Sequence, residues 1–249
     1  MTLRDAFLAS SGQARRLTAA ALLGALGLTA AACTGGDEDE PISEGSSPEE
    51  VMEGAKQDLD ETSGVEIRLA TADAPDDGDF LASAEGTIVA DPAAFEGVVA
   101  GRVQGIEASD ISVVAIGGDL YVDVPIVGWD TFDPQDFCAP DPALLLDPET
   151  GVSPILTATE GLEAGESERG GDDNSEVLTP YTGTVPGDTI RNILPCAEGE
   201  EFGAVYRIDS DGLLRDVEIT GEFFAGTDEI TYAIEILEYD VEREITAPE

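Results

Sequence analysis

Histidine is absent from this chain of 249 residues, and lysine occurs only at Lys56. Without histidine the chain cannot form a Ser–His–Asp triad, use an imidazole as general base or offer an imidazole to a metal ion. No phosphate-binding loop, dinucleotide-binding glycine motif or G-x-S-x-G motif occurs either. Asp and Glu number 54, so a pair of carboxylates at a given spacing indicates nothing about glycoside hydrolysis. The sequence therefore predicts a protein that is not an enzyme and needs no cofactor or metal.

Basic residues are also scarce, since Lys and Arg together number 11 and the net charge is −43. A surface of this charge repels phosphates, which excludes a nucleic-acid partner, and it stays at anionic headgroups only if an anchor holds it there. Solubility alone would explain the charge, but the acidic residues are spread along the whole chain and not gathered in one tail, which favours adaptation to a salty medium. Hydrophobic residues still make up 42%, enough for the core of one domain.

Long hydrophobic runs are limited to residues 17–32, and these 16 residues fall short of the about 20 that span a bilayer. Three arginines precede the run, small residues end it, and Cys33 follows. This pattern is typical of a bacterial lipoprotein signal peptide over residues 1–32, with a lipid such as palmitate on Cys33. We therefore expect a protein of the cell membrane, lipid-anchored on the extracytoplasmic face. Secretion without a lipid and a retained anchor helix are the alternatives.

Cysteine occurs three times, and if Cys33 carries lipid, Cys138 and Cys196 remain. Disulfides persist in oxidising compartments outside the cytoplasm, so a bridge between Cys138 and Cys196 is the candidate pairing. On the chain-entropy account it would stabilise the fold by about 3–4 kcal/mol. Two unpaired buried thiols are the alternative that the sequence leaves open.

The chain changes character after the lipidated cysteine. Residues 33–47 are acidic and rich in Gly and Ser, which predicts a flexible tether. The string Ser47–Glu50 then supplies an N-cap, a proline at the first helical position and a capping-box glutamate. Apolar residues follow at every fourth position, so we expect a helix that ends at Gly64. Residues 48–249 are expected to form a single domain.

Apolar and polar residues alternate through most of this domain, as in antiparallel strands with one apolar face. Asp211-Gly212 lies between two of the runs and predicts a hairpin turn. The string from Asp209 to Gly212 also resembles the start of a calcium loop, but it omits two positions of that loop, so we favour the hairpin. The expected strands are residues 65–69, 80–90, 95–104, 106–116, 119–124, 161–169, 175–184, 202–209, 213–224 and 228–238.

Residues 125–160 interrupt the alternation with prolines that exclude long elements. The apolar pieces between these prolines do not fit a period of two, so we expect them to pack over a sheet face. Short helices, the first two capped by Asp141 and Ser153, are expected at residues 143–146, 152–158 and 186–194. The predicted fold class is α+β: a large curved antiparallel β-sheet, or half-barrel, with short helices covering the concave face.

Several strings occur together in an order that resembles one protein family. Gly118–Val122 (GDLYV) and Gly128-Trp129 precede Asp141–Val152 (DPALLLDPETGV), and Tyr181–Asp188 (YTGTVPGD) and Leu213–Gly221 follow. This ordered set resembles the LppX/LprAFG family of actinobacterial lipoproteins over about residues 48–240. The resemblance implies a half-barrel antiparallel sheet with helices in its concave face, similar to the LolA/LolB lipoprotein carriers.

The resemblance also implies a function, because family members hold acylated lipids or glycolipids in a hydrophobic cavity and carry or present them in the cell envelope. For this chain it implies a lipid or glycolipid partner, membrane contact through the N-terminal lipid, and a membrane transporter as a further candidate partner. The alternative is a non-catalytic interaction lipoprotein that docks an envelope or transporter partner without a lipid ligand.

Apolar residues of the short helices and of two strands are expected to line that cavity, with ordinary core packing as the alternative for each. The expected lining residues are Leu144, Leu145, Ile155, Leu156, Ile190 and Ile193 from the helices, and Val113, Ala115, Leu120 and Val122 from the sheet.

Overall fold

Most of the expected domain is described by the computed structural model. The predicted signal peptide, Cys33, most of the predicted tether and Cys138 lie outside the described residues. Among the helices formed by the described residues, none is long and apolar enough to cross a membrane. The described residues are 45–72, 75, 78–103, 105–137, 139–171, 175–224 and 228–248.

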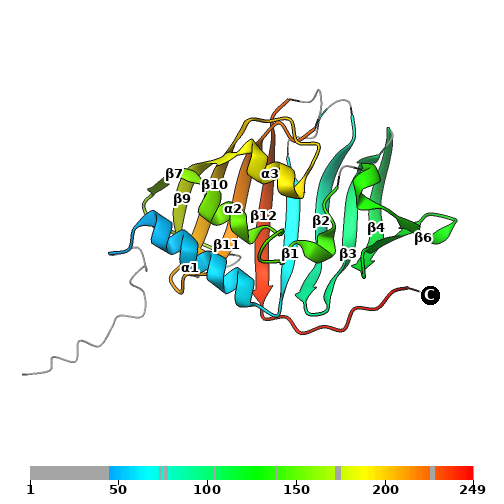
Figure 1. The fold of residues 1–249 in the computed structure, drawn as a ribbon, viewed down its shortest axis with the longest axis horizontal. Helices are drawn as coiled ribbons and strands as arrows, with labels where there is room; N and C mark the ends of the chain where they lie inside the picture. The colour runs from blue at the N-terminus through cyan, green and yellow to red at the C-terminus, as the bar shows by residue number, and fades with distance from the viewer. Residues whose placement is uncertain are drawn as a thin grey trace, which may run out of the picture. The chain divides into compact units, whose positions relative to one another are not determined.

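One antiparallel sheet dominates these residues, and its first and last strands are neighbours in the middle of the sheet (Figure 1). From β1 the chain meanders outwards through β2 to β6, crosses back between β6 and β7, and returns through β9, β10 and β11 to β12. The order is β6-β5-β4-β3-β2-β1-β12-β11-β10-β9-β7, with β8 paired to β9. In the described part of the chain the strands are β1 Gly64–Thr71, β2 Phe80–Ala90, β3 Ala93–Val103, β4 Ile106–Ile116, β5 Asp119–Val124, β6 Gly128–Phe132, β7 Glu160–Ala164, β8 Glu168–Gly170, β9 Glu176–Pro186, β10 Glu201–Asp209, β11 Leu214–Gly221 and β12 Ile230–Tyr239.

The alternation of side chains assigns one face of this curved, unclosed sheet to the core. In β1, Val65, Ile67 and Leu69 share the concave face, whereas Glu66 and Arg68 lie on the convex face. Paired strands continue both sets in register, because a residue and its cross-strand partner lie on the same side of a sheet. The period of two seen in the sequence therefore builds the apolar concave face.

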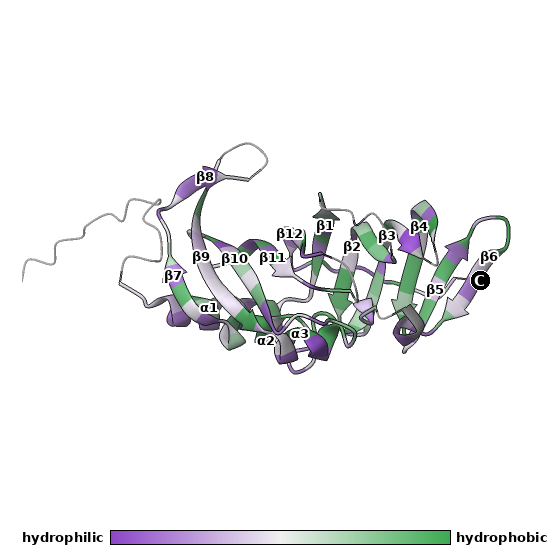
Figure 2. Ribbon diagram, turned by 90° about the horizontal axis from the view of Figure 1, so that it is seen from above, coloured by the Kyte–Doolittle hydropathy of each residue, from purple (hydrophilic) through white to green (hydrophobic). Residues whose placement is uncertain are grey.

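The helices lie on the concave face (Figure 2), which confirms the predicted fold class. Helix α1 (Pro48–Glu61) begins with the expected capping box. The Ser47 hydroxyl oxygen accepts a hydrogen bond from the Glu50 N–H (3.3 Å), and the Glu50 carboxylate accepts one from the Ser47 N–H (2.8 Å). Helix α2 (Ser153–Ala158) packs against α1, and α3 (Gly187–Ile193) packs against β9. The buried side chains of α1 are Val51, Met52, Ala55 and Leu59.

The proline-rich segment differs from the sequence prediction in two elements. Gly128–Phe132 forms the edge strand β6, although the sequence predicts no strand there, because prolines on both sides leave too short a run for a visible alternation. The helix expected at residues 143–146 is a 3₁₀ turn, η2 (Pro142–Leu144). Asp141 caps this turn as predicted, accepting a hydrogen bond from the Ala143 N–H at 3.0 Å. A further 3₁₀ turn, η1, spans Pro134–Phe137.

Two smaller expectations are also wrong. Ser153 does not cap α2, because its hydroxyl donates to the Asp60 carboxylate of α1 at 2.5 Å and so joins the two helices. The strand expected over residues 161–169 is divided into β7 and β8, which pair separately with β9. The hairpin at Asp211-Gly212 is confirmed, with the Gly212 N–H bonded to the Asp209 carbonyl at 3.1 Å.

Buried tyrosines on the concave face donate hydrogen bonds from their hydroxyls. The Thr159 hydroxyl donates its single proton to the Ile155 carbonyl at 2.8 Å. The Tyr206 hydroxyl, whose oxygen lies 2.6 Å from the Thr159 hydroxyl oxygen, is therefore the donor of the hydrogen bond between these two residues. Tyr232 donates to the Leu81 carbonyl at 2.9 Å. Burial raises the pKa of Tyr206 and of Tyr232 to about 12.

After β12 the C-terminal segment runs along the lower edge of the sheet in Figure 1, and its contacts lie on the convex face. The Val241 N–H bonds to the Gly64 carbonyl, and Arg243 contacts Glu96 at 2.9 Å and Thr87 at 3.3 Å. Further on, the side chain of Ile245 is buried in a small apolar cluster. Its neighbours in that cluster are Val89, Ala94, Val114, Ile116 and Tyr121.

Removing the capping hydroxyl in Ser47→Ala should lower the free energy of unfolding by about 1 kcal/mol, because the Glu50 N–H loses its acceptor. Urea denaturation followed by circular dichroism measures the change. Ser46→Ala is the matched control, since Ser46 is exposed and lies outside the helix. Equal effects of the two variants would contradict the capping role.

The protein should lose stability as the pH rises from about 10 to 12. An unfolded tyrosine has a pKa of about 10, and the folded state holds Tyr206 at about 12. Below pH 10 the tyrosine is neutral in both states. As the pH rises from about 10 to 12, the unfolded tyrosine loses its proton while the folded one keeps it, so the free energy of unfolding falls. Thermal unfolding across this range should show a smaller pH dependence for Tyr206→Phe than for the original chain. An identical pH dependence would contradict the assignment.

Candidate functional site

Strand register sorts the concave-face residues of the central strands into three rows that run across the sheet. One row is fully buried, and we call it the buried row: Val65, Ile88, Phe95, Ala115 and Leu120. The next is the middle row: Ile67, Gly86, Gly97, Val113 and Val122. The third is only partly covered, and we call it the open row: Ile234, Leu69, Ala84, Val99 and Ile111.

The difference between these rows comes from what lies over them. Turn η2 packs against β2, β3 and β4, and its Ala143 and the following Leu146 are buried in the same apolar cluster as the buried row. The open row has side chains of intermediate exposure in all five positions. An apolar strip therefore continues from the core to a part of the concave face that water reaches.

Two glycines leave the middle row shallow. Gly86 and Gly97 are direct cross-strand partners, and a Cβ atom on either would lie 2.8 Å or 2.6 Å from the ring of Phe95. The Phe95 ring therefore lies over the backbone of Gly86 and Gly97, in the space that side chains at these two positions would occupy. The ring of Phe95 thus extends from the buried row over the glycines of the middle row.

Aromatic side chains extend the concave face beyond β12. Phe223 lies with its ring centroid 5.0 Å from that of Phe202 and 5.0 Å from that of Tyr232, in tilted and edge-on arrangements. Tyr232 is two residues from Ile234 of the open row, so it lies on the same face of β12. The open row is thus bounded on one side by a packed aromatic cluster.

The structure gathers nine of the ten expected lining residues into one apolar cluster. Those with buried side chains are Val113, Ala115, Leu120, Ile155, Leu156 and Ile190, and those partly buried against them are Val122, Leu145 and Ile193. Leu144 is 45% exposed and does not belong to this cluster.

Sequence reasoning missed the open row. The alternation in β1 places Leu69 on the apolar face, and the same pattern could have been read for Val99 and Ile111. What the sequence could not show is that these three residues are aligned, because their register depends on which strands pair. It also could not show that the helices stop short of them.

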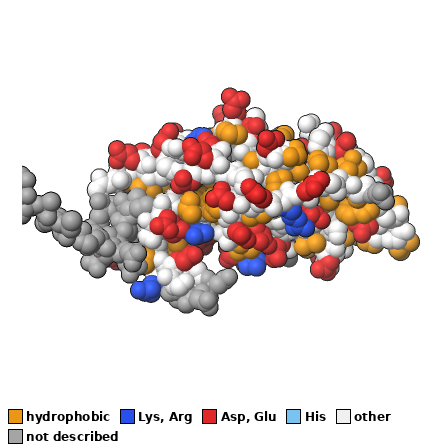
Figure 3. All heavy atoms as spheres, turned by 90° about the horizontal axis from the view of Figure 1, so that it is seen from below, with side chains coloured by type: hydrophobic (Ala, Val, Ile, Leu, Met, Phe, Trp, Pro, Cys, Tyr) orange, Lys and Arg blue, Asp and Glu red, His pale blue; other side chains and the backbone are white. Residues whose placement is uncertain are grey.

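The convex face is polar and strongly acidic. Arg207 contacts Asp216 at 2.5 Å and Glu218 at 3.1 Å, and burial raises the pKa of Asp216 more than Arg207 lowers it. In the space-filling view from below, acidic side chains are scattered over the molecule and basic ones are few (Figure 3). No group of three or more His, Cys, Asp or Glu in the described ranges is placed to hold a metal ion.

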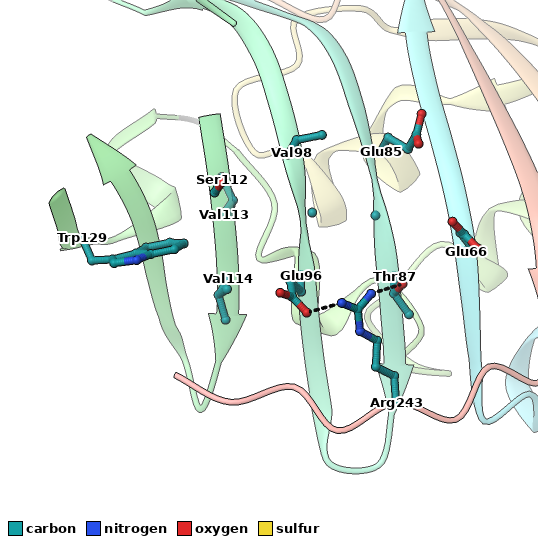
Figure 4. Close-up of a pocket in the computed structure, with 12 residues that line it drawn as sticks. Glu66, Glu85, Thr87, Glu96, Val98, Ser112, Val113, Val114, Trp129 and Arg243 are labelled. Atoms are coloured by element: carbon teal, nitrogen blue, oxygen red, sulfur yellow. Dashed lines mark hydrogen bonds and ion pairs between the residues drawn. The ribbon is translucent and has the colours of Figure 1, made fainter. Parts of the chain in front are cut away.

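A hollow of about 310 Å³ lies on the convex face (Figure 4). Glu66, Glu85 and Glu96 border it, together with Trp129 and Arg243, which binds Glu96. A second hollow, of about 330 Å³, lies near Phe80, Gly101 and Glu107. Of the expected lining residues, only Val113 borders either hollow.

The predicted disulfide and lipid sites involve residues outside the description. Cys33 and Cys138 are not among the described residues. Cys196 is exposed, and its sulfur is not a free thiol in the structure. The pairing of Cys138 with Cys196 stays a prediction.

Comparisons with known proteins agree with this architecture. The crystal structure of LprF from Mycobacterium bovis is similar with a TM-score of 0.62 and 12% identity, covering 81% of this chain and 96% of that chain. The crystal structure of the Mycobacterium tuberculosis lipoprotein LppX gives a TM-score of 0.59 and 16% identity, covering 80% of this chain and 98% of that chain. No curated protein matches the sequence.

The family comparison covers nearly the whole described domain. The family described as LppX_LprAFG lipoprotein matches residues 47–246, which include the capping box of α1, the complete sheet and the C-terminal segment on the convex face. A match of this extent shows membership, so this chain belongs to the LppX_LprAFG family of lipoproteins.

Proposed function

We propose that this chain is a membrane-anchored lipoprotein that binds an acylated lipid or glycolipid on its concave face and carries or presents it in the cell envelope. The observation that carries the proposal is the open row, an apolar strip that is continuous with the core and only partly covered. An apolar surface of this kind in a folded protein marks a place where another apolar group binds.

The dimensions of the open row suit an acyl chain. Five strands contribute to it, and strands are spaced about 4.8 Å apart, so the row extends across about 19 Å. An acyl chain reaches across about half of the roughly 30 Å hydrocarbon core of a bilayer. One chain lying across the strands would therefore find apolar side chains along its whole length, at about 25 cal/mol for each Å² removed from water.

The residues that the sequence analysis expected to line a cavity divide into two groups, which have different roles in this proposal. Those that are buried, such as Ile155 and Ile190, form the packed interior between sheet and helices. Partly buried ones, such as Val122 and Ile193, lie at its margin. We propose that the acyl chain contacts the open row and this margin, and that the buried residues support the surface from behind.

The remaining features of the proposal concern the anchor and the chemistry. We propose that residues 1–32 are a signal peptide, that residues 33–47 tether the domain to a lipid on Cys33, and that the protein is held on the extracytoplasmic face of the cell membrane. Cys138 and Cys196 are proposed to form a disulfide there. The proposal includes no catalysis, cofactor or metal, and a membrane transporter is the candidate recipient of the lipid.

Native mass spectrometry tests the proposal directly. The described residues contain a complete core of their own, so a chain beginning at residue 34 is expected to fold without the leader. Purified without detergent from a lipid-containing host, it should carry a bound mass that is lost on denaturation and fragments as an acylated lipid. A bare protein that also takes up no added phospholipid or glycolipid would instead support the interaction lipoprotein, and a transporter partner would be sought.

Neighbouring valines on opposite faces give a matched test of where the lipid binds. Val99 belongs to the open row, whereas Val98 lies on the convex face and is 46% exposed. Val99→Gln should weaken lipid uptake about tenfold, because a polar side chain replaces apolar contact area. Val98→Gln should leave uptake unchanged.

Both variants are measured by lipid titration in native mass spectrometry, with thermal unfolding as a check on folding. An equal loss of uptake in the two variants would place the lipid somewhere other than the concave face.

A further inference from the structure

The hairpin between β5 and β6 has an apolar tip that the fold does not bury. Its turn runs from Val124 to Val127, where the Val127 N–H donates to the Val124 carbonyl at 3.1 Å. Ile126 is fully exposed, and Val127 is 73% exposed. The tip projects from the edge of the sheet and is hydrophobic (Figures 1 and 2).

The backbone at this tip is also strained. Pro125 occupies the first central position of the turn and Ile126 the second, with φ +75°. A turn of this pattern places glycine or asparagine at the second position, because a side chain that branches at Cβ clashes there. Ile126 therefore carries a conformational penalty, and its exposed side chain recovers none of it by packing within the chain. The fold gives no reason for an isoleucine at this position.

Charge restricts what the tip can bind. No Lys, Arg or His occurs between Arg102 and Arg169, and Asp123 and Asp130 flank the tip directly. Such a surface is not attracted to anionic headgroups. An apolar tip followed by a tryptophan, Trp129, is instead suited to the interface of an uncharged or zwitterionic bilayer, where indole rings are favoured.

The length of the tether keeps the tip near a membrane. If Cys33 carries a lipid, the chain from Cys33 to Ser47 reaches at most about 50 Å when fully extended. The domain then cannot leave the neighbourhood of the bilayer, so even weak insertion of a short apolar hairpin is populated. This step rests on the proposed anchor.

We propose that the β5–β6 hairpin tip, residues 124–129, is a membrane-docking element that inserts Ile126 and Val127 into the interface of a zwitterionic bilayer. The docked hairpin would hold the edge of the sheet against the membrane. Trp129 lies on the convex face, so insertion of the tip does not cover the open row.

The chain supplies its own probe, because Trp129 is the single tryptophan. A chain beginning at residue 34, which lacks the lipid anchor, is mixed with phosphatidylcholine vesicles with and without brominated acyl chains. We expect a blue shift of the tryptophan emission, quenching by the brominated lipid, and co-flotation of the protein with the vesicles. Vesicles containing phosphatidylglycerol should bind more weakly at low salt, because the flanking aspartates are repelled.

Ile126→Asn is the informative variant, since asparagine tolerates a positive φ. It should reduce vesicle partitioning about tenfold or more through the loss of apolar contact, and at the same time raise the urea midpoint of unfolding. Ile106→Asn is the matched control, because Ile106 is an isoleucine at the start of β4 that is 70% exposed. It should leave partitioning unchanged.

Several outcomes would overturn the proposal. These are absence of flotation, an equal loss of partitioning in both variants, or a change of oligomeric state in Ile126→Asn without a change in vesicle binding. Failure here is separable from failure of the lipid-carrier proposal: flotation reports docking, whereas native mass spectrometry in the absence of vesicles reports cargo. Each result can be positive when the other is negative.

Discussion

An open antiparallel sheet with one apolar face must have that face covered, and the structure depends on how far this covering extends. The concave face of this sheet is apolar along its central strands, from Val65 to Leu69 in β1 and in register across the neighbouring strands. Closure into a barrel would cover such a face from all sides, but here the first and last strands meet in the middle and the two edges stay apart. The cover must therefore come from the short helices and turns.

These helices and turns are too short to cover the whole concave face. Helices α2 and α3 have 6 and 7 residues, and η2 has 3. Together with α1 they bury the rows nearest to them and leave the open row half covered. The prolines that interrupt residues 125–160 limit the length of η2 and α2, and Pro186 and Pro195 flank α3. The same prolines thus leave the apolar surface on which the lipid proposal rests.

The convex face obeys a different constraint, because most of its exposed side chains are charged or polar. Arg68 lies between Glu85 and Glu235 at 3.2 Å and 3.1 Å, and such exposed ion pairs contribute little to stability. Their effect is to keep this face in contact with water, whereas the two proposals assign binding to the concave face and to the sheet edge. The C-terminal segment covers an apolar cluster there, to which it contributes the buried side chain of Ile245.

The sequence by itself determined most of the strands and helix α1 with its cap, because periodicity and capping are local. The capping box at Ser47, the alternation in β1 and the turn at Asp211-Gly212 follow from neighbouring residues, and the structure contains all three. The family resemblance rested on ordered strings of the sequence, and it holds over residues 47–246.

Only the tertiary structure decided which apolar residues are buried and which stay accessible. Leu69, Val99 and Ile111 become one row through the pairing of β1 with β2, β2 with β3 and β3 with β4, and no local signal specifies those registers together. Leu144 looks like Leu145 in the sequence, yet it is exposed, because a 3₁₀ turn replaces the expected helix. The exposure and backbone conformation of Ile126 likewise depend on a hairpin whose second strand has too few residues to be recognised from its pattern.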